Sequence, residues 1–130
     1  MNLDEHITDV ITLINILNLD GIKPIPLLKK TFKAIKPGGS LIVAGPTSDE
    51  SFNKVEALIL KHLKEDGLLE TFKKDFELLK QRNKTILNPH ANYWSEEGMA
   101  ELLLEQGFSK IRALDNGIYK GLLYLIVAEK

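Results

Sequence analysis

The chain has 130 residues, a length that suits one compact domain. Its 17 Lys and Arg nearly balance 18 Asp and Glu, which argues against a basic surface for nucleic acid or anionic membranes. With no cysteine, it has no disulfide, thiolate metal site or cysteine nucleophile. The apolar runs are about half as long as a membrane span, and the first ten residues do not resemble a signal peptide. We therefore expect a soluble, cytoplasmic protein.

The first predicted elements are a strand, a helix and a second strand. Residues 9–17 form a β-branched apolar run without polar alternation, which is typical of a strand buried on both faces. Between residues 24 and 36 apolar side chains recur at spacings of three and four, which predicts an amphipathic helix. The sequence Lys-Pro-Gly-Gly at 36–39 is expected to end this helix, because the residue before proline avoids the helical conformation. Residues 40–44 then predict a short apolar strand.

Two helices are predicted after the second strand. Thr47 and Glu50 form a capping-box pattern before an amphipathic stretch that ends at Gly67. A second amphipathic stretch contains Phe72 and Phe76, which we interpret as packing residues rather than a clamp on a substrate. The region 68–92 is longer than a simple connection, so we interpret it as a helical insertion.

The C-terminal part predicts one more helix and two strands. Ser95 is a suitable cap for a helix that ends before Gly107. Two strand patterns, at 110–114 and 122–128, flank the turn sequence Asp-Asn-Gly, which predicts an antiparallel hairpin. The element order predicts a single α/β domain over residues 1–130. We expect three α/β/α layers and a sheet of about four strands, parallel except for this hairpin.

Three segments, in this order, resemble class I S-adenosylmethionine-dependent methyltransferases. The first is the strand at 9–17 with the helix after it, and the second is Ile-Lys-Pro-Gly-Gly at 35–39 leading into the next strand. The third is Tyr-Trp-Ser-Glu-Glu at 93–97, which opens a helix ending in Leu-Glu-Gln-Gly-Phe at 104–108 before the terminal hairpin. The resemblance covers nearly the whole chain. It implies a Rossmann-like sheet, methyl transfer to an unknown acceptor, and S-adenosylmethionine as the donor.

Only strands four to seven of the family's seven-stranded sheet are matched. In the family, a glycine-rich loop after strand one and an acidic residue after strand two hold the donor, and no Gly-x-Gly-x-Gly pattern occurs here. The resemblance therefore implies the C-terminal half of such an enzyme, which alone is expected to lack activity. A non-catalytic remnant that acts as an interaction module is the alternative.

This truncated match leaves the strand from Val10 to Leu17 as a bare sheet edge. Bare apolar edges attract other strands because their backbone groups are unpaired. We expect the edge to be covered by a second copy in a homo-oligomer, by a complementary N-terminal half, or by the chain's own first residues.

The resemblance also implies which residues face the ligands. Asn15, Ile16 and Asn18 follow the first strand and would contact the methionine part of the donor; turn hydrogen bonds are the other interpretation of the two asparagines. Gly45 and Pro46 end the second strand, where ligands approach open α/β sheets, although a plain strand-to-helix turn would use the same residues.

Two further residues are candidates for the acceptor side. His90 follows Asn-Pro in the insertion, and Tyr93 either walls an acceptor pocket or packs with Trp94 at the start of the next helix, which we favour. The histidines are not spaced like metal ligands. We name no catalytic residue, because transfer from a sulfonium depends mainly on alignment of the acceptor and exclusion of water.

Overall fold

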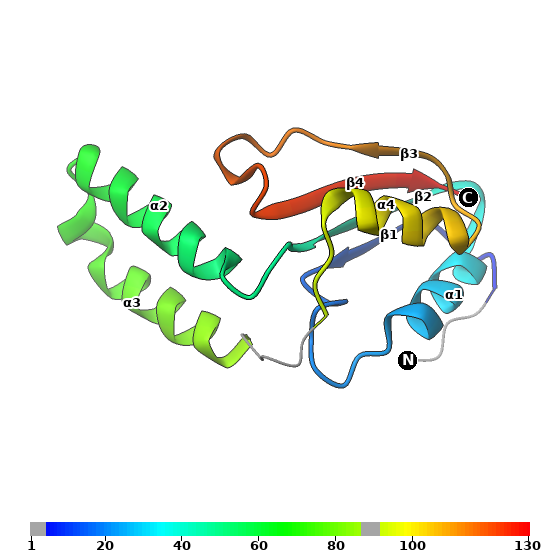
Figure 1. The fold of residues 1–130 in the computed structure, drawn as a ribbon, viewed down its shortest axis with the longest axis horizontal. Coiled ribbons are helices and arrows are strands. Elements are labelled where there is room, and N and C mark those ends of the chain that lie inside the picture. Colours follow the sequence, from blue (N-terminus) through cyan, green and yellow to red (C-terminus); the bar gives the residue numbers. More distant parts are fainter. Residues whose placement is uncertain (1–4, 87–91) are drawn as a thin grey trace.

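A computed structural model describes residues 5–86 and 92–130 (Figure 1). The elements, in chain order, are β1 (Thr8–Ile14), α1 (Pro24–Ala34), β2 (Ile35–Pro46), α2 (Ser51–Glu65), α3 (Leu69–Ile86), α4 (Glu96–Glu105), β3 (Ser109–Ala113), the 3₁₀ turn η1 (Gly117–Tyr119) and β4 (Leu123–Glu129). The strands and helices predicted from the sequence are all present. The α/β class and the four-stranded sheet are thus confirmed.

The sheet has the strand order β1-β2-β4-β3. β1 and β2 are parallel, with Ile14 opposite Ala44, whereas β4 is antiparallel to both β2 and β3. The predicted antiparallel pairing of the last two strands is therefore confirmed. Because β1 and β2 run in the same direction, their carboxyl ends lie at the same end of the sheet, with the loops that follow them.

The hydrophobic core lies on one face of the sheet. Leu28 of α1 and Leu103 of α4 belong to the same buried cluster as Val43 of β2 and Ile126 of β4. Figure 1 shows α1 and α4 on the same side of the strands. The right-handed crossover from β1 to β2 places α1 on this side, and α4 packs beside it.

The other face of the sheet is open within the described residues. Side chains alternate along a strand, so this open face consists of Val10, Thr12 and Ile14 of β1 together with Ile42, Ala44, Leu125 and Val127. Both α2 and α3 extend away from the sheet and pack on each other (Figure 1). β1 is thus not buried on both faces as its apolar run suggests, since Val10 and Ile14 are 50% and 55% exposed.

Of the three expected layers, the described residues form the sheet and one helical layer. A helical layer on the open face would require further strands on the outer side of β1. Right-handed crossovers that run in that direction place their helices on the open face.

Two local expectations are wrong. The segment 36–39 does not separate helix from strand: Ile35 already pairs with Thr8, and the segment bulges out before Ser40 pairs with Val10. The capping box at the start of α2 is not formed, because the Glu50 side chain makes no cap. The Thr47 hydroxyl instead donates to the Gly121 carbonyl oxygen at 2.7 Å, which ties the end of β2 to the turn before β4.

The cap of α4 follows the sequence prediction. The Ser95 hydroxyl oxygen accepts a hydrogen bond from the Gly98 backbone N–H at 3.0 Å. At the other end, Gly107 has φ +100°, a conformation that favours glycine and ends the helix. The segment 93–95 is thereby held at the same end of the sheet as the loops after β1 and β2.

Candidate functional site

The candidate site lies at the carboxyl ends of β1 and β2. The Asn15 backbone N–H donates to the Ala44 carbonyl oxygen at 2.9 Å, so the loop after β1 starts directly beside Gly45. The structure therefore places Asn15, assigned to the donor side, beside Gly45, assigned to the acceptor side. Their proximity follows from the parallel pairing of the two strands.

Asn15 turns the chain out of the sheet. Its φ is +54°, a left-handed conformation that asparagine adopts more readily than most residues. The loop then closes on itself, because the Leu19 N–H donates to the Ile16 carbonyl oxygen at 3.1 Å. The turn interpretation accounts for an asparagine at position 15.

Asn18 is different. Its side chain is only 2% exposed, and its Oδ1 atom has no hydrogen-bond partner within the described structure. An unpaired buried acceptor costs about 1–3 kcal/mol, and a turn role would have paired it. The atom, in the loop after β1, is thus a buried acceptor without a partner among the described residues. Position 18 could be found from the sequence, but the burial of its side chain could not.

Gly45 is required by its neighbour across the sheet. Gly45 lies opposite Tyr124 of β4, and a Cβ atom at position 45 would come within 2.6 Å of the Tyr124 hydroxyl oxygen. The ring therefore occupies the space that any other residue at 45 would need. Pro46, the next residue, is buried as well.

Tyr124 lies beside the candidate site, and the sequence did not single it out. Its hydroxyl is buried and lacks a hydrogen-bond partner within the described structure, and burial raises the pKa of this hydroxyl well above its usual range. The group remains a neutral hydroxyl next to Gly45. A tyrosine among apolar strand residues was the only signal in the sequence.

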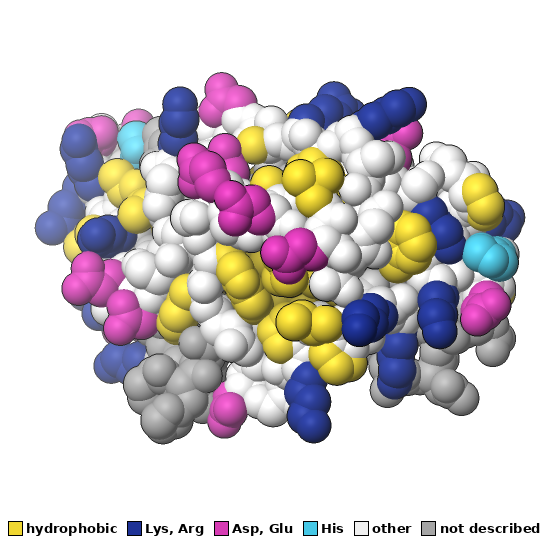
Figure 2. All heavy atoms as spheres, turned by 45° about the vertical axis from the view of Figure 1, so that its right-hand side comes forward, with side chains coloured by type: hydrophobic (Ala, Val, Ile, Leu, Met, Phe, Trp, Pro, Cys, Tyr) yellow, Lys and Arg dark blue, Asp and Glu magenta, His cyan; other side chains and the backbone are white. Residues whose placement is uncertain are grey.

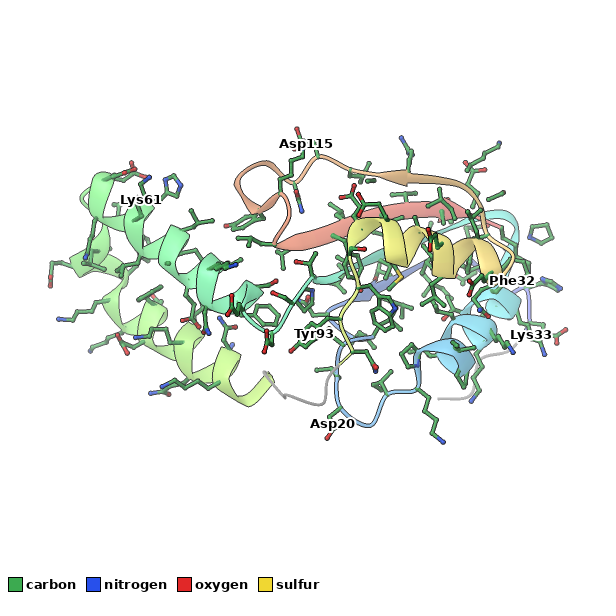
Figure 3. All side chains as sticks on the ribbon, in the orientation of Figure 1. Asp20, Phe32, Lys33, Lys61, Tyr93 and Asp115 are labelled. Carbon is green, nitrogen blue, oxygen red and sulfur yellow. The ribbon has the colours of Figure 1, made fainter. Side chains whose placement is uncertain are left out.

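Tyr93 lies on the segment that leads into α4, and Figure 3 shows it at the end of the sheet where the loop bearing Asp20 lies. Its pKa is raised, first by partial burial and second by the negative charge of Asp49. The neighbouring Trp94 packs against the core, as the packing interpretation of this segment expects. His90 lies outside the described residues.

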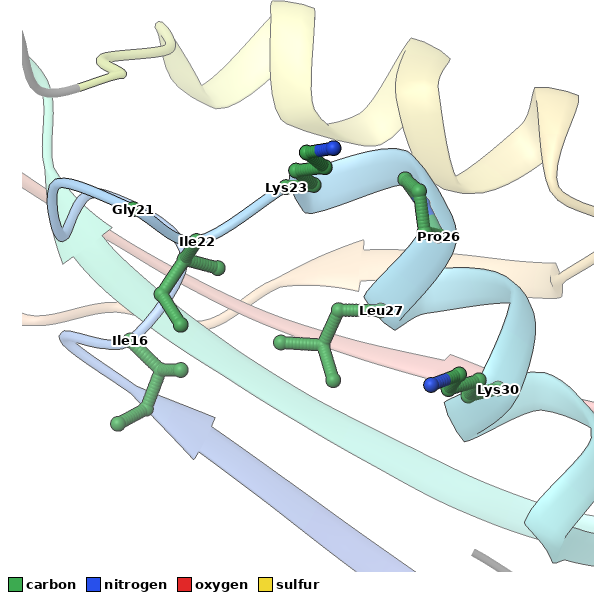
Figure 4. A pocket seen from close by; sticks show the side chains of 7 residues that line it. All are labelled: Ile16, Gly21, Ile22, Lys23, Pro26, Leu27 and Lys30. Carbon is green, nitrogen blue, oxygen red and sulfur yellow. The ribbon is translucent and has the colours of Figure 1, made fainter. Parts of the chain in front are cut away.

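A cavity of about 320 Å³ lies between the loop after β1 and helix α1. Its lining consists of Ile16, Gly21, Ile22, Lys23, Pro26, Leu27 and Lys30. Figure 4 shows the aliphatic side chains in its middle and the two lysines at different ends. Ile16 is the one predicted donor-side residue that lines it, so its side chain points to an apolar hollow beside the site.

Positive and negative side chains are mixed on the described surface. Figure 2 shows basic and acidic side chains interspersed on one face, with apolar side chains near its middle. Within residues 5–86 and 92–130, no three His, Asp or Glu side chains are grouped as metal ligands. Over the same residues, no helix combines the length and apolar character needed to cross a membrane.

No protein-family model and no curated protein matches the sequence. Solved structures do match. One is an S-adenosylmethionine-dependent methyltransferase from Thermotoga maritima, described as a possible histamine N-methyltransferase: the TM-score is 0.60 at 20% identity, over 100% of this chain and 59% of that chain. The CurJ carbon methyltransferase gives 0.61 at 23% identity, over 98% and 30%. Human N-acetylserotonin methyltransferase, solved with S-adenosylmethionine, gives 0.53 at 20%, over 94% and 29%.

At these identities the likeness establishes the fold. The chain has the Rossmann-like fold of S-adenosylmethionine-dependent methyltransferases. It spans 59% of the Thermotoga maritima structure and less than a third of the other two.

Proposed function

We propose that this chain is the C-terminal half of an S-adenosylmethionine-dependent methyltransferase and contributes the acceptor side and part of the donor site. The fold likeness over nearly the whole chain supports this role, as does the greater length of the similar methyltransferases. The observation that carries the proposal is the buried, unpaired Asn18 Oδ1 in the loop after β1. Ligands of open α/β sheets bind outside the carboxyl ends of the strands, where this loop lies.

The residues present fit one part of the donor. The methionine portion of S-adenosylmethionine carries an ammonium group. Its N–H groups donate hydrogen bonds, and an amide oxygen such as Asn18 Oδ1 can accept one. Asn15 shapes the loop, and Ile16 adds apolar surface next to it. When bound, the donor supplies a methyl group on a positively charged sulfur. The protein's part is to hold and align the partners and to exclude water.

On the acceptor side, the proposal keeps Gly45, Pro46, Tyr93 and His90 as residues that shape the site rather than as reactive groups. Tyr124 fixes the shape of this surface at Gly45. Helix α3, which belongs to the insertion at 68–92, lies at the same end of the sheet (Figure 1), and the proposal assigns the insertion the role of a cover over the acceptor.

The rest of the donor site must come from another chain segment. The sequence lacks a Gly-x-Gly-x-Gly loop, in which backbone approaches the ligand too closely for a Cβ atom. A complementary N-terminal half that adds a strand to β1 would place such a loop beside residues 15–18. Until then we expect weak donor binding and no methyl transfer.

Nuclear magnetic resonance of the ¹⁵N-labelled chain tests the proposal directly. Titration with millimolar S-adenosylmethionine should shift the amide signals of residues 15–18 and 45, and Asn18→Ala should abolish these shifts. Asn53→Ala, which changes an exposed asparagine on α2, is the matched control and should leave them unchanged. Shifts confined to other residues, or none, would contradict donor binding at this site.

The lack of the glycine-rich loop also favours a second candidate, a non-catalytic remnant that binds a partner through the β1 edge. The titration with S-adenosylmethionine also distinguishes the two candidates. A remnant would show no response to S-adenosylmethionine even after a complementary N-terminal chain has bound, whereas the enzyme half would then bind the donor more tightly.

A further inference from the structure

The two edges of the sheet are built differently. β3, at one edge, carries the exposed charges of Lys110 and Arg112 and has an irregular register with β4. Charges and irregularities of this kind keep an edge from pairing with other strands. β1, at the other edge, has no charge, proline or glycine between Val10 and Ile14, and both of these residues are about half exposed. Within residues 5–86 and 92–130, one edge is protected and the other is not.

The outward backbone groups of β1 can be assigned from its pairing with β2. The Asn15 N–H points to β2, where it donates to Ala44. In a parallel ladder, residues alternate between facing the neighbour and facing away, so Thr12 and Ile14 present their N–H and C=O groups to the free edge. The outward carbonyl of Val10 is already occupied, because the Thr8 hydroxyl donates to it at 3.0 Å.

We propose that a second copy of this chain pairs with β1 in the antiparallel direction, about a two-fold axis at Leu13. Thr12 of one copy then lies opposite Ile14 of the other, and the symmetry repeats this pair. All the outward groups of these two residues are satisfied, and the occupied carbonyl of Val10 stays outside the pairing. The Thr8 hydroxyl thereby selects the register.

The side chains and charges suit this self-pairing. Thr12 and Ile14 are β-branched, and such cross-strand neighbours stabilise antiparallel pairs. The nearest charge on the strand, Asp9, has Lys36 at 3.8 Å and does not meet another carboxylate. A two-fold interface uses the same patch twice, and this edge is complementary to itself in hydrogen bonding and has no charged residue between Val10 and Ile14.

The pairing goes beyond the proposed function and competes with it. Antiparallel pairing points the two loops at residues 15–18 in opposite directions, and neither copy brings a glycine-rich loop to the other, so neither completes the other's donor site. A complementary N-terminal half needs the same edge. The second copy therefore protects the edge while that half is absent.

The first test is the mass of the chain in solution. Sedimentation of the full chain should show a species of twice its 14.6 kDa, with dissociation on dilution. Thr12→Lys places two lysines close together at the axis and should weaken the dimer at least about tenfold. Ala113→Lys, at the protected β3 edge, is the matched control and should leave the mass unchanged. Both positions are exposed, and circular dichroism verifies that each variant is folded.

The second test addresses the register and uses the absence of cysteine from the sequence. Opposite residues in a hydrogen-bonded antiparallel pair have Cα atoms about 5.5 Å apart, within reach of a disulfide. Under mild oxidation, a mixture of Thr12→Cys and Ile14→Cys chains should therefore cross-link more than either variant alone.

Several results would each overturn the proposal. These are a chain that stays monomeric at all concentrations, a dimer that survives Thr12→Lys, and equal cross-linking of the single variants and their mixture. A monomer whose amides at 12 and 14 gain protection only on addition of a complementary N-terminal chain would also overturn it and assign the edge to that chain. The donor titration is independent of all these results.

Discussion

At the scale of single residues, the candidate site contains two buried polar atoms without partners in the described structure, Asn18 Oδ1 and the Tyr124 hydroxyl. Each opposes folding of the isolated chain, because burial removes hydration without replacing it. Both lie near the carboxyl ends of β1 and β2 or across from them. The two unpaired atoms lower the stability of the fold at the place where we expect a ligand. Functional sites commonly reduce stability in this way.

Asn18→Leu should separate stability from function. Leucine has a similar volume and no polar atom, so the variant should gain about 1 kcal/mol in the free energy of unfolding, measured by urea denaturation. The same variant should lose the amide shifts caused by S-adenosylmethionine. Loss of stability on substitution would mean that the asparagine is satisfied in solution and that the atom is not kept for a ligand.

Tyr124 should make stability fall at high pH. Burial raises the pKa of its hydroxyl in the folded chain above the value near 10 of an unfolded chain. Above pH 10 the unfolded state therefore loses the proton first, and the free energy of unfolding falls as pH rises. Tyr124→Phe removes this contribution, so its unfolding should depend less on pH above about pH 10. Tyr119→Phe, at a less buried position, is the control.

At the scale of elements, α2 and α3 form a helical hairpin that packs mainly on itself. Phe76, 7% exposed, lies between the two helices, and Asn83 Nδ2 donates to Glu56 Oε1 at 2.9 Å. A pair of helices with so few buried residues should open independently of the sheet.

Phe76→Ala should reveal this independence. Removing the buried ring should increase hydrogen exchange in α2 and α3 by at least about tenfold, equivalent to about 1.4 kcal/mol. Exchange in β2 and β4 should not change. Phe72→Ala, where the ring is 42% exposed, is the matched control with a smaller effect. Faster exchange throughout the sheet would contradict a separate hairpin.

The sequence predicts the positions of helices and strands better than it predicts which side chains are buried and what they contact. The β-branched run of β1 identifies a strand because its side chains favour extended backbone. The same run wrongly predicts burial on both faces, because the residues of a strand do not show whether helices cover each face of its sheet. The proximity of Asn15 and Gly45 is predictable, because parallel strands end together. The burial of Asn18 and the contact between Gly45 and Tyr124 depend on packing across the sheet, which local patterns do not encode.

At the scale of the whole molecule, the open face and the free edge meet along β1, through Val10, Thr12 and Ile14. One surface thus combines unpaired backbone groups with apolar side chains. The edge supplies directional hydrogen bonds that fix a register, and the open face supplies apolar area without such direction. The edge therefore determines which strand binds, and the face adds affinity to any strand that does.

The proposed dimer should for this reason be nearly insensitive to salt. Charged interfaces weaken as ions screen them, whereas backbone pairing between Thr12 and Ile14 involves no side-chain charge. We expect the dissociation constant from sedimentation to change less than about twofold between about 50 and about 500 mM NaCl. Thr12→Lys should reverse this behaviour, because salt screens the two added lysines and restores part of the affinity. A wild-type dimer that dissociates with rising salt would place the contact on charged surfaces such as α2 and α3 instead of β1.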